Sequence, residues 1–349
     1  MNANHLSSLL WAVTLCAGSA HAQASSVMPD YKPLQQVSGV IRISGDYHQR
    51  AMLDHWEQEF HKVQPDIVFK NNLTSTVHGI PALTFDVADI GLLGREIAPL
   101  ENLSFRRMFK YDPLEIATAT GSFNIPYEAF ALGIFVNRNN PISRITFQQA
   151  AAIFGCGHGQ NIRTWGQLGL TGAWANKPIH VFGYPAGNNI ATFFELKVMR
   201  GPASGGPTLP SGVRWNCDLK EFANTYDAND KPVVSSDAFM MRELGKDPYA
   251  IAYSGIAEMT PETKPLALAE HPGSDYVPFT FATVADRTYP LTRSMYLYLN
   301  KPPGKPLDPR VAEFVSFILS RQGQESVRQQ TVFLPLTAEA VVEQRKKLD

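Results

Sequence analysis

Residues 40–48 read VIRISGDYH, a short apolar run followed by a small polar loop. The run has the β-branched composition of a strand. Apolar residues then recur at helical spacing, which predicts a helix. These residues are Met52, Leu53, Trp56, Phe60 and Val63. Pro65 ends this helix. A strand that passes through a polar loop into a helix is the repeating unit of α/β folds, and we predict that class here.

The same unit recurs along the chain. A second strand at 67–69 leads through a polar segment into a short helix at Gly79, and a third strand occupies 87–93. After an apolar run at 130–136 and a polar turn, a second α/β region begins. Its expected helices lie at 147–154 and 190–199, and its strands at 179–182 and 249–253. A strand at 294–299 and a helix at 311–318 complete the pattern, which predicts two α/β units.

The first 22 residues have the pattern of a signal peptide. Their apolar core, residues 9–18, is too short to span a bilayer as a helix, and Ala20 and Ala22 form a small-x-small cleavage site before Gln23. No Lys or Arg precedes the core. Cys16 follows the bulky Leu15, which disfavours a lipoprotein. We therefore predict an exported protein, periplasmic or secreted.

The composition and charge of the chain exclude several classes of function. The chain has 349 residues, of which 44% are hydrophobic and 18% charged, as in ordinary globular domains. A net charge of -1 gives no electrostatic footprint for nucleic acid. No later stretch is apolar enough to span a membrane. The motifs of serine hydrolases, zinc peptidases, nucleotide-binding loops and dinucleotide folds are absent, and we expect neither a cofactor nor a metal site.

Removal of the signal peptide leaves two cysteines, Cys156 and Cys217. An even number of thiols in an oxidising compartment favours one disulfide between them. The alternative is two separate buried thiols.

Five segments, in this order, carry a family resemblance. They read ADIG with GRE (88–91, 94–96), FVNRNNPI (135–142) with IFG and TWGQLG (153–155, 164–169), AIAYSG (250–255), YPLTRS (289–294) and FILSRQGQ (317–324). Together they resemble the phosphate-binding proteins of ABC transporters, within the type II periplasmic-binding superfamily. The resemblance extends from about residue 40 to residue 336.

The resemblance implies two α/β lobes with a ligand cleft between them that closes by a hinge. Lobe 1 would comprise 37–130 plus 285–349, and lobe 2 would comprise 131–284. It also implies a binding protein and not an enzyme, a small phosphate-like anion as ligand, and an inner-membrane ABC permease or a sensor as partner.

The ligand loops depart from the family pattern. The third loop of the family usually reads R-x-x-G-S-G-T-R. Here Tyr184 replaces its arginine, and the S-G-T-R part is replaced by Asn188, Asn189, Ile190 and Ala191. Gly94 replaces the serine before Arg95. The ligand residues implied by position are Ser44, Gly45, Asp46, Tyr47, His48, Ser75, Thr76, Arg95, Tyr184, Asn188 and Asn189.

Several roles stay open at this point. Arg95 matches the geometry of an oxyanion but could equally form a structural ion pair. Asp46 could accept the hydrogen of a protonated phosphate, or it could cap the following helix, and Asn188 could likewise be a cap. We expect Arg95 and Asp46 to face one cleft beside residues 74–79. The other functions to consider are a secreted hydrolase that uses Asp46 with His48 or His78, and a binding protein for a different small organic ligand.

Overall fold

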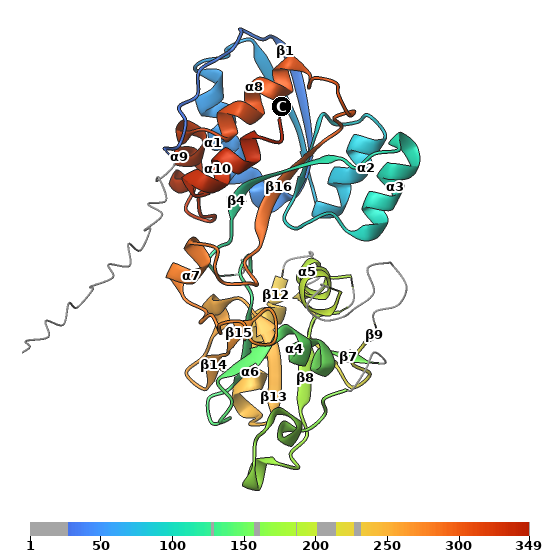
Figure 1. Cartoon of the computed structure of the whole chain (residues 1–349), viewed down its shortest axis with the longest axis vertical. Helices are drawn as coiled ribbons and strands as arrows, with labels where there is room; N and C mark the ends of the chain where they lie inside the picture. The colour runs from blue at the N-terminus through green and yellow to red at the C-terminus, as the bar shows by residue number, and fades with distance from the viewer. Residues whose placement is uncertain are drawn as a thin grey trace, which may run out of the picture.

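A computed structural model describes residues 27–126, 129–156, 161–185, 187–200, 214–226 and 232–348. The signal peptide predicted at residues 1–22 lies outside these ranges. The chain forms two α/β lobes, as predicted, and Figure 1 shows that the N-terminal (blue) and C-terminal (red) segments share one of them. No helix within the described ranges combines the length and the apolar character needed to cross a membrane.

Lobe 1 is built on a five-stranded sheet of order β2-β1-β3-β16-β4. The central strand β1 (Gly39–Gly45) runs parallel to β2 (Ile67–Leu73) and β3 (Ile90–Leu93). The late strand β16 (Ser294–Leu299) inserts antiparallel between β3 and β4 (Leu114–Thr120). The sheet therefore needs residues from both ends of the chain.

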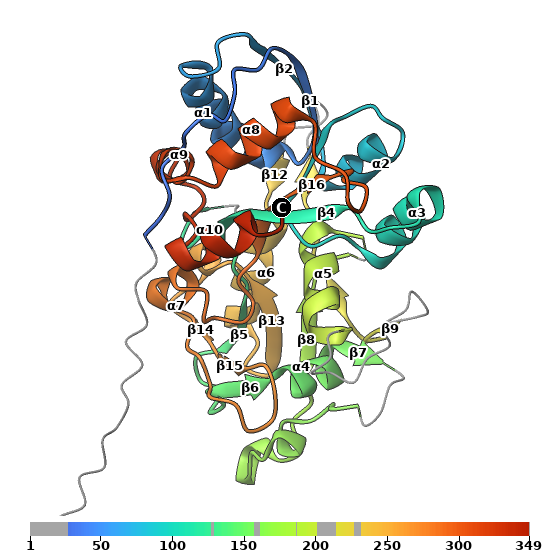
Figure 2. The same cartoon turned by 45° about the horizontal axis from the view of Figure 1, so that its top comes forward.

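Helices cover both faces of this sheet (Figure 2). On one face lie α1 (Arg50–His61), α8 (Pro309–Ile318), α9 (Arg321–Gln329) and α10 (Ala338–Arg345), whose apolar residues form the main core of the lobe. On the other face lie α2 (Gly79–Thr84) and α3 (Pro99–Phe109), with a smaller core that includes Phe105 and Tyr298. All the apolar residues predicted for the first helix are buried except Val63.

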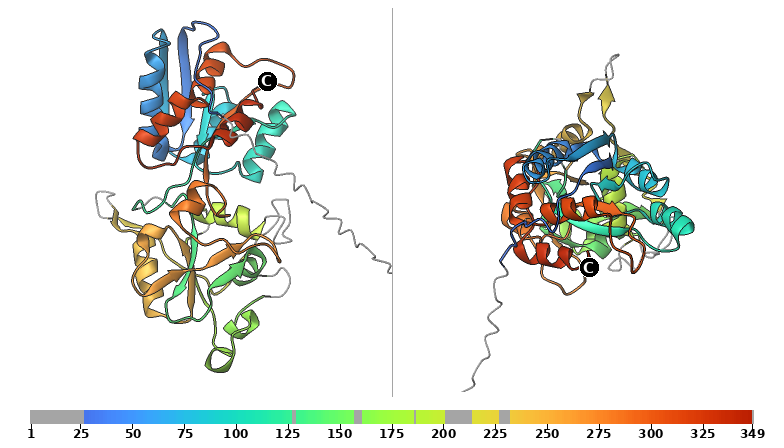
Figure 3. Two further views of the ribbon diagram at one scale, coloured as in Figure 1. Left: turned by 60° about the vertical axis from the view of Figure 1, so that its left-hand side comes forward. Right: turned by 90° about the horizontal axis from the view of Figure 1, so that it is seen from above.

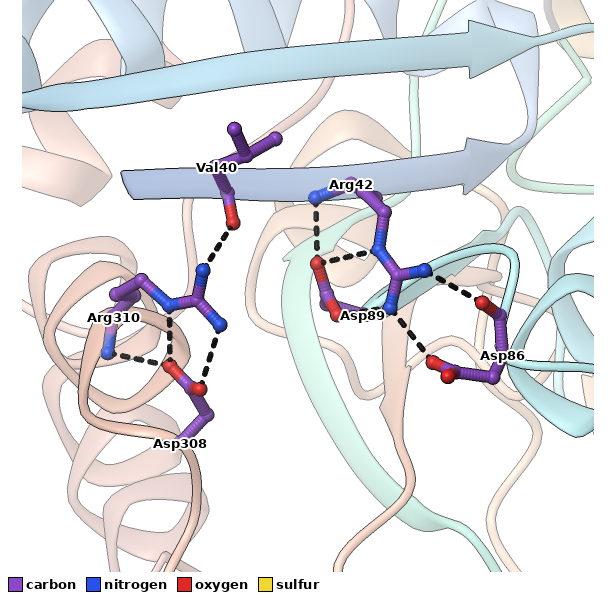
Figure 4. Close-up of polar contacts among 6 residues, drawn as sticks. All are labelled: Val40, Arg42, Asp86, Asp89, Asp308 and Arg310. Carbon is purple, nitrogen blue, oxygen red and sulfur yellow. Dashed lines mark hydrogen bonds and ion pairs between the residues drawn. The ribbon is translucent and has the colours of Figure 1, made fainter. Parts of the chain in front are cut away.

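Charged side chains tie the start of β1 to neighbouring loops (Figure 4). The Arg42 guanidinium donates to Asp89 and Asp86, with both Nη2–oxygen distances at 2.7 Å. Arg310 pairs with Asp308 and donates to the Val40 carbonyl at 2.8 Å. Burial opposes ionisation of Asp89, but the bonds from Arg42 outweigh it and hold the pKa of Asp89 below its ordinary value.

Lobe 2 has a second sheet, of order β10-β8-β13-β5-β14. These strands are Lys220–Glu221, His180–Gly183, Ala250–Ser254, Gly133–Asn137 and Thr263–Pro265. Three helices pack against this sheet: α4 (Phe147–Phe154), α5 (Asn189–Phe194) with its π-helical extension Glu195–Met199, and α6 (Ser236–Lys246). Short strand pairs complete the lobe: β6 (Arg144–Thr146) with β15 (Ala267–Ala269), β7 (Gly155–Cys156) with β9 (Arg214–Trp215), and β11 (Thr225–Tyr226) with β12 (Pro232–Val234).

The pair β7 and β9 brings the two cysteines together. The sulfur atoms of Cys156 and Cys217 lie 3.2 Å apart, and both residues are thiols in the structure. The predicted disulfide stays a prediction.

Two chain segments connect the lobes, one between β4 and β5 and one between α7 (Phe281–Ala285) and β16. The left view of Figure 3 shows the lobes one above the other with these connections between them. The segments are bonded to each other, since Arg293 N donates to Phe130 O at 2.8 Å and Leu132 N donates to Leu291 O at 3.0 Å. Tyr289 and Leu291 lie in the core of lobe 2. The exact lobe boundaries given above remain a prediction.

Candidate functional site

A cavity of about 840 Å³ lies between the lobes. Lobe 1 contributes the loop after β1, and lobe 2 contributes the starts of α5 and α6. The connecting segments contribute Phe130 and Arg293. The described lining residues are Asp46, Tyr47, His48, Ala129, Phe130, Asn188, Asn189, Ile190, Asn224, Tyr226, Ser235, Ser236, Asp237 and Arg293. The cavity is therefore assembled from segments that are far apart in the chain.

Asp46 follows β1 and caps the helical turn η1 (Tyr47–Gln49). It is 2% exposed, and its carboxylate accepts bonds from His48 N at 3.1 Å, His48 Nδ1 at 2.8 Å and Thr76 Oγ1 at 2.9 Å. Burial would raise the pKa of Asp46, but the bonds from His48 and Thr76 prevail and hold that pKa below its ordinary value. The bond from His48 N is the helix cap, one of the two roles considered for Asp46.

Two glycines near this loop leave room for close neighbours: the Leu92 backbone lies against Gly45, and the Asp46 carboxylate lies against Gly94. Gly45 has a φ of 142°, and a Cβ there would lie 2.0 Å from Leu92 O. A Cβ at Gly94 would lie 2.4 Å from Asp46 Oδ2. A serine at position 94 would therefore crowd the Asp46 carboxylate and require it to shift.

The loop before α2 supports Asp46 and does not itself line the cavity. Thr76 is fully buried and donates to Asp46, while Gly94 N donates to Thr76 Oγ1 at 3.4 Å. Ser75 precedes the turn η2 (Thr76–His78) without a side-chain cap bond. Ser44, Gly45, Ser75 and Thr76 are absent from the described lining.

Arg95 also lies outside the described lining, although it was expected to face the same cleft as Asp46. Its guanidinium is buried and donates to the two carboxylate oxygens of Glu101 at 2.9 and 2.8 Å, and to Glu96 O at 2.9 Å. Glu101 stands in the first turn of α3, where a carboxylate is stabilised by the helix dipole. The structure therefore holds Arg95 in the ion pair that the sequence left open as its alternative role.

In lobe 2, Asn188 and Asn189 line the cavity and Tyr184 does not. Asn188 is the N-cap of α5, with its Oδ1 accepting from Ile190 N at 2.8 Å. Tyr184 is buried, donates to Ser254 Oγ at 3.3 Å and packs against the Tyr253 ring. The position of the family arginine is thus occupied by a neutral residue of the lobe 2 core.

Two charged lining residues were missed in the sequence. Arg293 is 4% exposed, its Nε and Nη2 donate to Gly94 O at 3.0 and 2.7 Å, and its Nη1 donates to Ala129 O at 3.1 Å. Its guanidinium also lies over the Phe130 and Phe193 rings, with centroid distances of 4.7 and 5.3 Å. Arg293 belongs to the YPLTRS segment, which had been used for the fold alone.

The second missed residue is Asp237, in the first turn of α6. It is 7% exposed, and burial raises its pKa above the ordinary value, while the Tyr184 hydroxyl opposes that shift. The signal was present in the sequence as S-S-D before an apolar helix, a typical helix start. Within the described ranges no group of His, Cys, Asp or Glu is arranged to hold a metal ion.

Comparison with known proteins places the chain among binding proteins. The sequence profile of the PBP superfamily domain matches residues 19–322. The phosphate-binding protein PstS of Pseudomonas aeruginosa is 30% identical over 336 residues, covering 95% of this chain and 94% of that protein. Two solved structures share the fold. An ABC-type phosphate transport receptor from Vibrio cholerae has a TM-score of 0.54 at 19% identity, covering 84% of this chain and all of that chain. PstS from Borrelia burgdorferi has a TM-score of 0.54 at 16% identity, covering 85% and 99%.

Proposed function

Because the chain belongs to the PBP superfamily and, within it, to the family of the phosphate-binding protein PstS, we propose that it captures phosphate or a closely related small oxyanion. The ligand would lie in the cavity between the lobes. The protein would be exported to the periplasm through its N-terminal signal peptide and would deliver the ligand to an inner-membrane ABC permease.

The observation that carries the proposal is Arg293 in the cavity lining. A guanidinium presents donors in a planar fork that matches an oxyanion, and it stays charged at every physiological pH. The carbonyls of Gly94 and Ala129 and the rings of Phe130 and Phe193 hold this guanidinium in place. Amide groups of Asn188 and Asn189 can add neutral donors from the opposite lobe.

Phosphate binding should be weaker than in relatives that keep the third-loop arginine. Tyr184 replaces that arginine, and each charge-assisted hydrogen bond contributes about 1.5–3 kcal/mol. That range corresponds to roughly a tenfold to hundredfold change in dissociation constant.

We propose binding without catalysis, as in the relatives. Asp46 and His48 both line the cavity, but they are bonded to each other in a helix cap, with the Asp46 carboxylate also held by Thr76. The hydrolase alternative predicts turnover of phosphate esters, whereas the binding function predicts one ligand bound per chain.

The test is calorimetric titration of the mature protein with phosphate, sulfate and molybdate, together with an assay for phosphate released from phosphate esters. Phosphate at 100 times its dissociation constant should stabilise the fold by about 2.7 kcal/mol. Arg293→Ala should weaken binding roughly tenfold to hundredfold, and Arg293→Lys should weaken it less. The control is Arg107→Ala, which removes an exposed arginine of α3. Absence of binding by phosphate and by every related oxyanion, or steady release of phosphate from esters, would overturn the proposal.

A further inference from the structure

The charged groups of the cavity are divided between its two sides. Arg293 precedes β16 and is anchored to the loop after β3, so its positive charge belongs to lobe 1 and the connecting segments. Asp237 belongs to α6 of lobe 2, and Glu258 adds negative charge near it. The cation Arg293 therefore lies toward lobe 1, beside the Asp46 carboxylate, which is bonded to His48 and Thr76, whereas the charged lining group of lobe 2 is the carboxylate of Asp237.

The two lining carboxylates differ in their remaining capacity for hydrogen bonds. Asp46 already accepts three bonds, from two groups of His48 and from Thr76. Asp237 has only neutral hydroxyl neighbours within the described part of the chain, namely Ser236 at 3.4 Å and Tyr184. A carboxylate has about four acceptor positions, so Asp237 keeps most of its capacity for a ligand.

Asp237 also lacks a counter-charge on the protein. Among the described residues no lysine, arginine or histidine forms an ion pair with Asp237, and the groups that act on it are Tyr184, Ser236 and Glu258. A buried carboxylate without a cationic partner is energetically unfavourable, although its position in the first turn of α6 gives partial compensation from the helix dipole. A cation that enters the cavity would supply the missing charge at a position that excludes most water.

The size of the cavity allows a ligand larger than a tetrahedral oxyanion. Its volume of about 840 Å³ falls in the range of roughly 300–1,000 Å³ typical of sites for organic molecules. Three asparagines, Asn188, Asn189 and Asn224, also line the cavity and bring side-chain amides. These groups can bond to either donors or acceptors.

From this arrangement we propose that the cavity selects a small phosphonate or phosphate monoester bearing a primary ammonium group. Its oxyanion lies at Arg293, and its ammonium lies at Asp237. This inference rests on the proposed capture of a phosphoryl oxyanion and specifies its ligand class.

The experiment compares phosphoryl ligands with and without an amine. Calorimetry at pH 7 would use 2-aminoethylphosphonate, 3-aminopropylphosphonate, ethylphosphonate, 2-hydroxyethylphosphonate, phosphoethanolamine and inorganic phosphate. At least one aminophosphonate should bind roughly tenfold to hundredfold more tightly than ethylphosphonate. The comparison of phosphoethanolamine with the aminophosphonates distinguishes an ester ligand from a phosphonate.

Asp237→Asn should abolish the preference for the amine, because the ammonium contact loses its charged partner. Asp218→Asn is the matched control, an exposed aspartate of lobe 2 outside the described lining, and should retain the preference. Melting temperatures report whether the variants fold, and the wild-type ligand series stands without them.

Equal affinity for aminophosphonates and ethylphosphonate would overturn the inference, as would equal affinity for 2-hydroxyethylphosphonate. Retention of the preference in Asp237→Asn would overturn it too. If inorganic phosphate binds and no amine preference is found, the inference fails alone. If no phosphoryl compound binds, the proposed function fails with it.

Discussion

Replacing Arg95 by alanine should destabilise lobe 1 and leave ligand affinity unchanged. The guanidinium makes two bonds to Glu101, at 2.9 and 2.8 Å, and the side chains are 3% and 16% exposed. Removing one partner of a buried ion pair costs about 3–5 kcal/mol, because the other charge stays buried. Glu101 keeps a bond from Ala98 N at 2.7 Å and some contact with water, so we expect about 3 kcal/mol.

Thermal unfolding and calorimetric titration would measure both effects on the same sample. A loss of about 3 kcal/mol should lower the melting temperature by roughly 6–12 °C. The double variant Arg95→Met/Glu101→Gln should recover part of the stability, because no unpaired charge is then buried. The reasoning would be refuted if Arg95→Ala weakened phosphate binding tenfold or more without a change in melting temperature, because Arg95 would then be a ligand residue.

Three further predictions concern local chemistry. Under oxidising conditions Cys156 and Cys217 should form a disulfide, detected as resistance to alkylation and a mass lower by two hydrogens. Closing a loop of about 60 residues should stabilise the fold by about 4 kcal/mol relative to Cys217→Ser. Gly94→Ser should lower stability by about 1–3 kcal/mol through overpacking against Asp46, and thermal unfolding should show partial recovery when Asp46→Ser is added. Asp89→Asn should lower the free energy of unfolding at pH 7. The pKa of Asp89 is lower in the folded than in the unfolded protein, so its ionised form stabilises the fold above the unfolded-state pKa, and this contribution is lost as pH falls through the folded-state pKa. Denaturation should therefore show a larger difference in unfolding free energy between wild type and variant at pH 7 than at pH 2.

The local elements of this protein could be predicted from the sequence because they depend on short-range periodicity. The apolar spacing between Met52 and Phe60 defines the buried face of α1, and β1, β3 and β16 appear as apolar runs. The order of the family segments indicated the two-lobed architecture as well. Residues whose role is local, such as the caps Asp46 and Asn188, were also among the predicted candidates.

Which charged groups face the ligand depended on contacts between distant segments. Arg95 follows a strand of lobe 1 as a ligand residue would, but α3 brings Glu101 to it and removes it from the candidates. Arg293 reaches the cavity because β16 inserts beside β3, a pairing of residues about 200 positions apart in the chain. Spacing along the sequence carries no information about such a pairing.

The sequence alone therefore determined the fold class, which follows from local patterns of apolar and polar residues, and the family, which follows from the resemblance of five motif segments. The tertiary structure decided the charge of the site. A buried charge is defined by its partners, and Arg95 has its counter-charge at Glu101 whereas Asp237 has none in the described part of the chain. These partners are brought together only when the two lobes are folded.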